Sequence, residues 1–214
     1  SFKYFSDVSL LNFYEITETT NQNGQIRIAS YDSSIGRDSA LGQPMTASYA
    51  HLPMFDRHST GDIFLASPYN YFNNASILSY YPYFKQTITH EIGHALGLKH
   101  PQTALGSYGA DASGTTLPDS TMAYAPYDGG TASSVGLYTN SRPTTLMVKD
   151  IAAIQYLYGK NEQYNLTDTV YTLSSFSNKD YIYASIWDAG GNDTFSWSDQ
   201  SSSASIDLTD GSYS

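Results

Sequence analysis

The alternation of hydrophobic and polar residues predicts short strands in the first third of the chain. Residues 10–16 and 25–30 alternate in this way, and we expect further short strands at residues 46–52 and 62–66. Asn23 and Gly24 lie between the first two of these segments and are typical of a tight turn. We expect the residues before them, 1–8, to form the end of a helix.

Two longer segments carry apolar residues at helical spacing. In the first, residues 83–98, Gly97 is expected to end the helix, and the apolar positions are Ile88, Ile92, Ala95 and Leu96. The second, residues 144–158, precedes a capping Gly159 and has a predicted buried face of Leu146, Ile151, Ile154, Leu157 and Tyr158. The intervening residues 101–142 are predicted to be a loop, and loops of such length are usually functional.

The pattern changes near residue 160. Beyond it we expect short strands at residues 170–173, 181–187, 194–197 and 205–208. This change predicts two domains, one at residues 1–160 and the start of an all-β domain at residues 161–214. The second domain stops abruptly at Ser214, so we expect it to be truncated.

Composition excludes several classes of function. The formal net charge of -10 repels nucleic acid and suits the binding of divalent cations. There is no cysteine, which rules out disulfides, thiolate metal sites and a cysteine nucleophile but leaves the compartment open. No apolar run approaches the roughly 18 residues of a membrane span, so we expect no membrane partner. The chain begins at Ser1 without a signal segment, which is typical of a processed or trimmed product.

Three of the five histidines lie in one segment, HEIGHALGLKH. His90 and His94 are four residues apart on a predicted helix, so both imidazoles project from one face and can bind one Zn²⁺. Gly97 allows the chain to reverse, so that His100 can approach the same metal. Three protein ligands leave a position for water, and Glu91 is placed to reach that water. The alternative is a chance HExxH sequence, which the added glycine and third histidine disfavour.

This spacing resembles the metzincins, whose pattern HExxHxxGxxH is followed by a methionine-containing turn. Pro101 points within them to the serralysin family of bacterial secreted proteases, and residues 87–101, 149–159 and 186–195 are similar to serralysin segments. The resemblance implies an α+β fold: a twisted, mostly parallel sheet with an antiparallel edge strand, an active-site helix, a Met-turn and a C-terminal helix, then the start of an all-β calcium-binding domain. It also implies that an N-terminal strand and helix precede Ser1 and that a calcium β-roll, whose repeats are not in this sequence, usually follows.

The resemblance further implies an activity and its residues. We expect a secreted, extracellular, zinc-dependent endopeptidase, with Glu91 as the general base. In the sequence STMAY, Met122 is expected to form an apolar floor beneath the zinc. Tyr124 is expected to be a further zinc ligand that swings away and stabilises the oxyanion. The expected partners are protein or peptide substrates and a proteinaceous inhibitor, and the expected state is a monomer.

Two more sites are expected from the same resemblance. Residues 187–193 (WDAGGND) carry carboxylates around a glycine turn, which suits Ca²⁺, and the implied calcium ligands are Asn165, Thr167, Thr169, Asp188, Gly190, Gly191 and Asp193. The alternative is a solvated acidic turn. Residues 48–53 (SYAHLP) resemble an edge strand that binds peptide, and the implied contacts are Tyr49, Ala50 and His51. The alternative is an edge strand without a ligand role, closed by Pro53.

Two other functions compete with the peptidase. A secreted calcium- and zinc-binding module without turnover has no need for a carboxylate at position 91, so Glu91 favours the enzyme. An HExxH protein of another clan would not carry His100 and Met122 at these positions.

Overall fold

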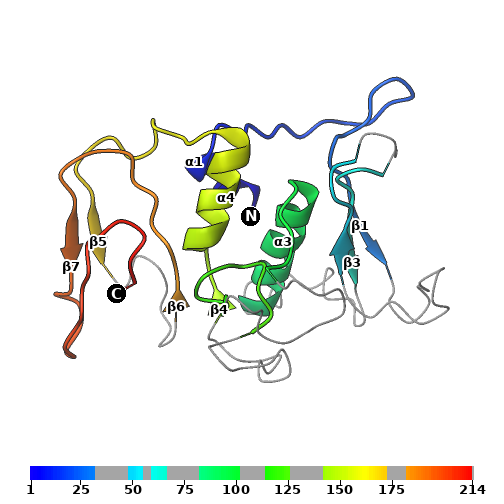
Figure 1. Cartoon of the computed structure of the whole chain (residues 1–214). Helices are drawn as coiled ribbons and strands as arrows, with labels where there is room; N and C mark the ends of the chain where they lie inside the picture. Colours follow the sequence, from blue (N-terminus) through cyan, green and yellow to red (C-terminus); the bar gives the residue numbers. More distant parts are fainter. Residues whose placement is uncertain are drawn as a thin grey trace.

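The computed structural model describes residues 1–31, 48–54, 59–66, 82–101, 114–125, 142–172 and 182–213, apart from the side chains at 82, 83 and 182. The helices α1 (Phe2–Val8), α3 (Pro82–Ala95) and α4 (Val148–Tyr158) lie at the centre of the molecule. Figure 1 shows β1 and β3 on one side of them and β5 and β7 on the other. Among the described residues, no helix is long and apolar enough to cross a membrane.

The end of α3 is set by backbone hydrogen bonds rather than by hydrophobic spacing. Leu98 N donates to Gly93 O at 2.8 Å and Gly97 N donates to His94 O at 2.9 Å. This pair of bonds forms a Schellman motif, in which the left-handed residue is Gly97 with φ of 98°. The helix therefore ends at Ala95, and the prediction that it extends to residue 98 is wrong.

Helix α4 begins four residues later than predicted. Met147, with φ of -93° and ψ of 171°, is extended and caps the helix, and its N–H donates to the Asp150 carboxylate at 2.9 Å. Gly159 ends the helix with φ of 78°, as expected. Leu146, Ile151 and Ile154 are buried, but Leu157 is 50 % exposed because it lies at the border of the apolar stripe, beside Gly97.

The described part of the main sheet has the order β1–β3–β2. Strands β1 (Ile28–Tyr31) and β3 (Ile63–Ala66) are parallel, with Ile28 opposite Ile63. Strand β2 (Tyr49–Ala50) is antiparallel to β3, with Tyr49 opposite Phe64, and lies at the sheet edge where the sequence predicts an antiparallel strand.

Two predictions for the N-terminal segment are wrong. Residues 10–16 form no strand; the Leu10 N–H bonds to Gly159 O at 3.1 Å, while Leu11 and Phe13 pack against the core. The turn that follows is centred on residues 20 and 21 and is closed by a 2.9 Å bond from Thr19 N to Gln22 O, rather than placed at Asn23 and Gly24. Tertiary contacts determine the structure of residues 10–16, and a local hydrogen bond determines the position of the turn. The alternation of hydrophobic and polar residues specifies neither.

The C-terminal strands are short and paired in parallel. Strand β4 (Arg142–Pro143) pairs with β6 (Ile182–Tyr183), and β5 (Val170–Thr172) pairs with β7 (Thr194–Ser196). Residues 205–208 form no strand, contrary to expectation, since Ile206 and Leu208 are exposed and bury no face. Most of the expected loop 101–142 lies outside the described residues; its described residues 114–125 contain turns.

A single buried cluster joins the helices to the sheet and to the loop at residue 122. Its fully buried members include Phe5 of α1, Ile63 of β3, Ile92 of α3 and Ile154 of α4, with Met122 nearly as deep. Burial of a side chain of this size contributes roughly 1.5–3 kcal/mol. The cluster anchors α3 through Ile92.

Candidate metal centre

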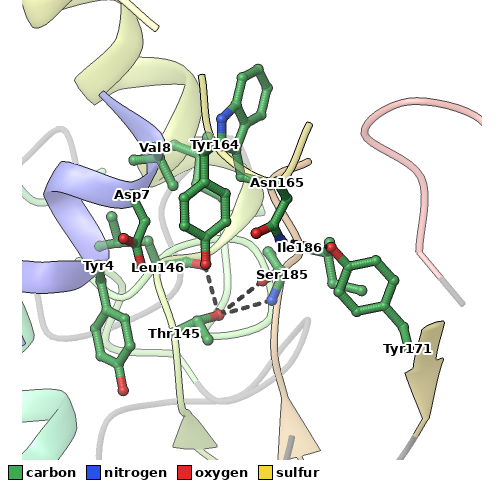
Figure 2. Close-up of a pocket in the computed structure, with 12 residues that line it drawn as sticks. Tyr4, Asp7, Val8, Thr145, Leu146, Tyr164, Asn165, Tyr171, Ser185 and Ile186 are labelled. Atoms are coloured by element: carbon green, nitrogen blue, oxygen red, sulfur yellow. Dashed lines mark hydrogen bonds between the residues drawn. The ribbon is translucent and has the colours of Figure 1, made fainter. Parts of the chain in front are cut away.

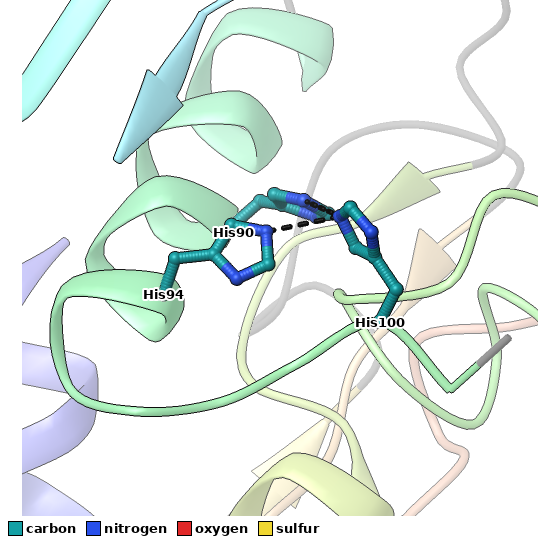
Figure 3. Close-up of side chains that lie close together, drawn as sticks. All are labelled: His90, His94 and His100. Carbon is teal, nitrogen blue, oxygen red and sulfur yellow. Dashed lines mark hydrogen bonds between the residues drawn. The ribbon is translucent and has the colours of Figure 1, made fainter. Parts of the chain in front are cut away.

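Three imidazoles converge at the C-terminal end of α3 (Figure 3). His90 and His94 come from successive turns of the helix, and His100 reaches them after the reversal at Gly97. The Nε2 atom of His100 lies 3.0 Å from Nε2 of His90 and 2.9 Å from Nε2 of His94. The structure thus brings together the histidines that the sequence predicts to share a metal.

The outer ring nitrogens fix the tautomers of two of these histidines. Nδ1 of His90 lies 2.8 Å from Thr121 O, and Nδ1 of His94 lies 2.7 Å from Leu98 O. A carbonyl oxygen only accepts, so both Nδ1 atoms donate and both Nε2 atoms keep their lone pairs. The converging Nε2 atoms of His90 and His94 therefore have the free lone pairs that a metal ligand needs.

Burial keeps the three rings neutral. It lowers the pKa of His90 to about 3, with the neighbouring His94 adding to the effect. Burial and His94 likewise lower the pKa of His100 to about 4, and burial lowers that of His94. Neutral imidazole is the form that binds metal, and lone pairs this close repel one another unless a cation lies between them. The residues present therefore fit a Zn²⁺ ion.

Tyr124 lies at the same point. Its phenolic oxygen is 2.8 Å from Nε2 of His100, and its ring centroid is 4.5 Å from that of His100. The predicted extra ligand is consequently within reach of the cluster.

Met122 packs directly against the helix between the two histidines. Its side chain is 2 % exposed, and a Cβ atom added to Gly93 would lie 2.7 Å from its sulfur. A Cβ atom at position 93 would therefore require the Met122 side chain to shift. No role is predicted for Gly93 above, although a glycine inside a helical pattern is itself a signal of close packing.

Glu91 is buried beside the histidines. It is 5 % exposed, and its Oε2 atom has no hydrogen-bond partner among the described residues. Burial raises the pKa of its carboxyl to about 8. A buried carboxyl oxygen without a partner among the described residues is a candidate functional group.

Two protein-family models match the chain. The matrixin model of peptidase family M10 matches residues 1–106, and the model of the M10 serralysin C-terminal region matches residues 157–214. The sequence is 33% identical to Serralysin A of Dickeya chrysanthemi, over 98% of this chain and 44% of that protein. The chain belongs to the serralysin family of metzincins. It is also 31% identical to metallopeptidase AprA of Pseudomonas marginalis, over 98% of this chain and 45% of that protein.

Membership of the serralysin family accounts for the histidine cluster, since this is a family of zinc metalloendopeptidases. The mixed α and β architecture with a small sheet fits a metzincin domain. The chain spans less than half the length of the serralysins named above.

The serralysin-like edge strand carries an aromatic cluster. The Tyr49 ring stacks on that of Phe64 with centroids 4.8 Å apart. The His51 ring lies 5.5 Å from Phe64, and its Nδ1 is 3.0 Å from Ser59 O. Tyr49 and Ala50 pair with Phe64 and Ile63 of β3 in antiparallel register.

Some of the expected calcium ligands come together and others do not. Asp193 Oδ1 accepts from Thr169 N at 2.9 Å, and a Cβ atom on Gly191 would lie 2.8 Å from Thr167 O. Asp188 instead accepts a 2.5 Å bond from the Tyr171 hydroxyl, which also accepts from Asn165. Among the described residues, no group of three acidic or histidine ligand atoms forms here.

The same region contains Gly190, an expected calcium ligand, and Asp168. Gly190 lies against Leu166. Asp168, for which the sequence pattern predicts no role, accepts from Asn192 N at 2.8 Å. A cavity of about 180 Å³ lies next to Asn165, between Tyr4 and Asp7 of α1 on one side and Tyr171 on the other (Figure 2). It does not include any of the three histidines.

Proposed function

We propose that this chain carries the active site of a secreted zinc-dependent endopeptidase, which hydrolyses peptide bonds within proteins. The convergence of three neutral imidazoles beside a buried carboxyl carries the proposal. Zn²⁺ would be held by His90, His94 and His100, with Tyr124 as a further ligand. When bound, it would supply Lewis acidity toward water and toward a peptide carbonyl.

Glu91 is the general base in this proposal. Its carboxylate takes a proton from the attacking water and passes it to the amine that leaves as the C–N bond breaks. A group with this task works best when its pKa lies near the working pH, and burial moves Glu91 in that direction. Its Oε2 atom, which has no hydrogen-bond partner among the described residues, is available for the proton.

Tyr124 and the edge strand complete the proposed site. The Tyr124 hydroxyl donates a hydrogen bond to the oxygen that becomes negative in the tetrahedral transition state. An extended substrate lies alongside β2 as an added strand, next to Tyr49, Ala50 and His51. An added strand recognises backbone first, so this mode suits an enzyme that accepts many sequences.

We also propose a Ca²⁺ ion between residues 165–169 and 188–193, at the start of a β domain that follows residue 160. The match of residues 157–214 to a serralysin C-terminal model supports this, as does the approach of Gly191 and Asp193 to the backbone of Thr167 and Thr169. Because the ion would take oxygen ligands from both segments, it would hold the two segments together in a chain without cysteine.

Casein hydrolysis by the purified chain tests the proposed function. Turnover should disappear with a zinc chelator, and added zinc should restore it. Cleavage that persists with the metal removed would contradict a zinc peptidase. Stoichiometric zinc without any cleavage would favour a binding module.

A further inference from the structure

Asp150 is a buried carboxylate at the start of α4, 2 % exposed. It accepts three hydrogen bonds, from Ser120 Oγ at 2.6 Å, Thr121 N at 2.7 Å and Met147 N at 2.9 Å. Among the described residues it forms no ion pair; its neighbour Lys149 bonds to Thr115 Oγ1 instead. Burial raises the pKa of this carboxyl, and the hydrogen bonds from Ser120, Thr121 and Met147 oppose that shift. A buried carboxylate held only by donors is costly to maintain.

The hydrogen bonds of Asp150 continue to the metal centre through one peptide group. The Ser120 hydroxyl, which donates to Asp150, accepts from Met122 N at 3.0 Å. Met122 N and Thr121 O belong to the same peptide unit, and Thr121 O accepts from His90 Nδ1 at 2.8 Å. An unbroken series of donors therefore runs from His90 to Asp150, with every proton directed toward the carboxylate.

Such a series is cooperative in a buried setting. A negative charge at one end strengthens each donor–acceptor bond in turn, because each group is polarised by the next. Thr121 and Met122 are nearly inaccessible to solvent, so water does not screen the effect. The result at the far end is a stronger bond at His90 Nδ1, and hence more electron density at Nε2.

We propose that Asp150 is a positioning residue for the metal centre, acting on His90 through Ser120 and the peptide between Thr121 and Met122. It fixes the tautomer and ring orientation of His90 and raises its affinity for a divalent cation. In other zinc sites a carboxylate bonds directly to the ligand histidine. Here the carboxylate acts on the histidine through one hydroxyl and one peptide group. This assignment rests on the proposed zinc site but not on turnover.

Zinc affinity, measured by competition with a chromophoric chelator, tests the proposal alongside the melting temperature of the metal-free protein. Ser120→Ala and Asp150→Asn should weaken zinc binding by about 10–100-fold, the usual effect of losing an outer partner of a ligand histidine. Ser120→Thr keeps the hydroxyl and should restore most of the affinity. Gln155→Ala is the matched control, since it removes a bond from α4 to Val8 O away from the histidines; it should lower the melting temperature and leave zinc affinity unchanged.

The visible absorption of the cobalt-loaded protein gives an independent readout, because it reports the ligand field at the metal rather than stability. Ser120→Ala should shift it and Gln155→Ala should not. If Asp150→Asn does not fold, the Ser120 variants decide. Unchanged zinc affinity and cobalt absorption in folded Ser120→Ala would overturn the inference while leaving the peptidase intact. Absence of zinc binding by the wild type would overturn both.

Discussion

The phenolic oxygen of Tyr124 lies 2.8 Å from Nε2 of His100, at the point where the imidazoles converge. The contact makes Tyr124 the residue that separates a serralysin-like mechanism from a simpler three-histidine site.

Replacing Tyr124 with phenylalanine removes the hydroxyl and keeps the ring. Zinc content should remain, since three histidines remain, while kcat should fall by about 10²–10³-fold, the effect of losing one oxyanion donor. KM should change less, because the hydroxyl acts mainly in the transition state. Tyr158→Phe, which loses a phenol bonded to Leu96 O, is the control and should keep its turnover. Full activity of Tyr124→Phe would make this tyrosine structural.

A methyl group at Gly93 should disturb the floor of the site. Alanine in a helix gains about 1 kcal/mol over glycine, whereas overpacking costs about 1–3 kcal/mol. The 2.7 Å approach to the buried Met122 sulfur favours the second effect, so Gly93→Ala should be destabilising. The same change in a Met122→Ala background should instead stabilise, and urea unfolding of the four proteins measures this coupling. Additive effects would mean that the two residues do not touch.

Calcium should stabilise the chain through residues 165–193. At 100 times the dissociation constant the gain is about 2.7 kcal/mol, or roughly 5–10 °C in melting temperature for a chain of this size. Asp193→Ala should abolish the difference between calcium and a chelator that spares zinc. The exposed Asp210 offers a matched control, and Asp210→Ala should retain that difference. An equal melting temperature of the wild type in both buffers would contradict the proposed calcium site.

Loss of His100 should empty the metal centre. Elemental analysis should find about one zinc per wild-type chain, and His100→Ala should hold little, because only the two helix histidines remain. Lys99→Ala changes the exposed neighbour and should keep its zinc. A fully loaded His100→Ala protein would exclude this histidine as a ligand.

Local sequence patterns predicted the histidine site well. Two histidines one helical turn apart and a glycine that reverses the chain determine most of that geometry within eleven residues. The series of hydrogen-bond donors from His90 to Asp150 could not be predicted in this way. It depends on contacts between residues about thirty positions apart and on the backbone carbonyl of Thr121, whose role no pattern of side chains indicates.

Strand predictions were less secure because alternation does not specify a partner. Residues 63–66 form β3 since β1 and β2 pair with them, whereas residues 10–16 alternate but pack against the core instead. The roles of Glu91 and of the proposed calcium ligands remain predictions.

Glu91→Gln is the most direct test of the central claim that a metal-assisted peptidase operates here. The amide keeps the size of the side chain and cannot take a proton from water. Zinc content and chelator competition should match the wild type, while casein hydrolysis should fall by about 10²–10⁴-fold or more. A zinc-loaded Glu91→Gln protein that cleaves casein at a near-normal rate would contradict the account.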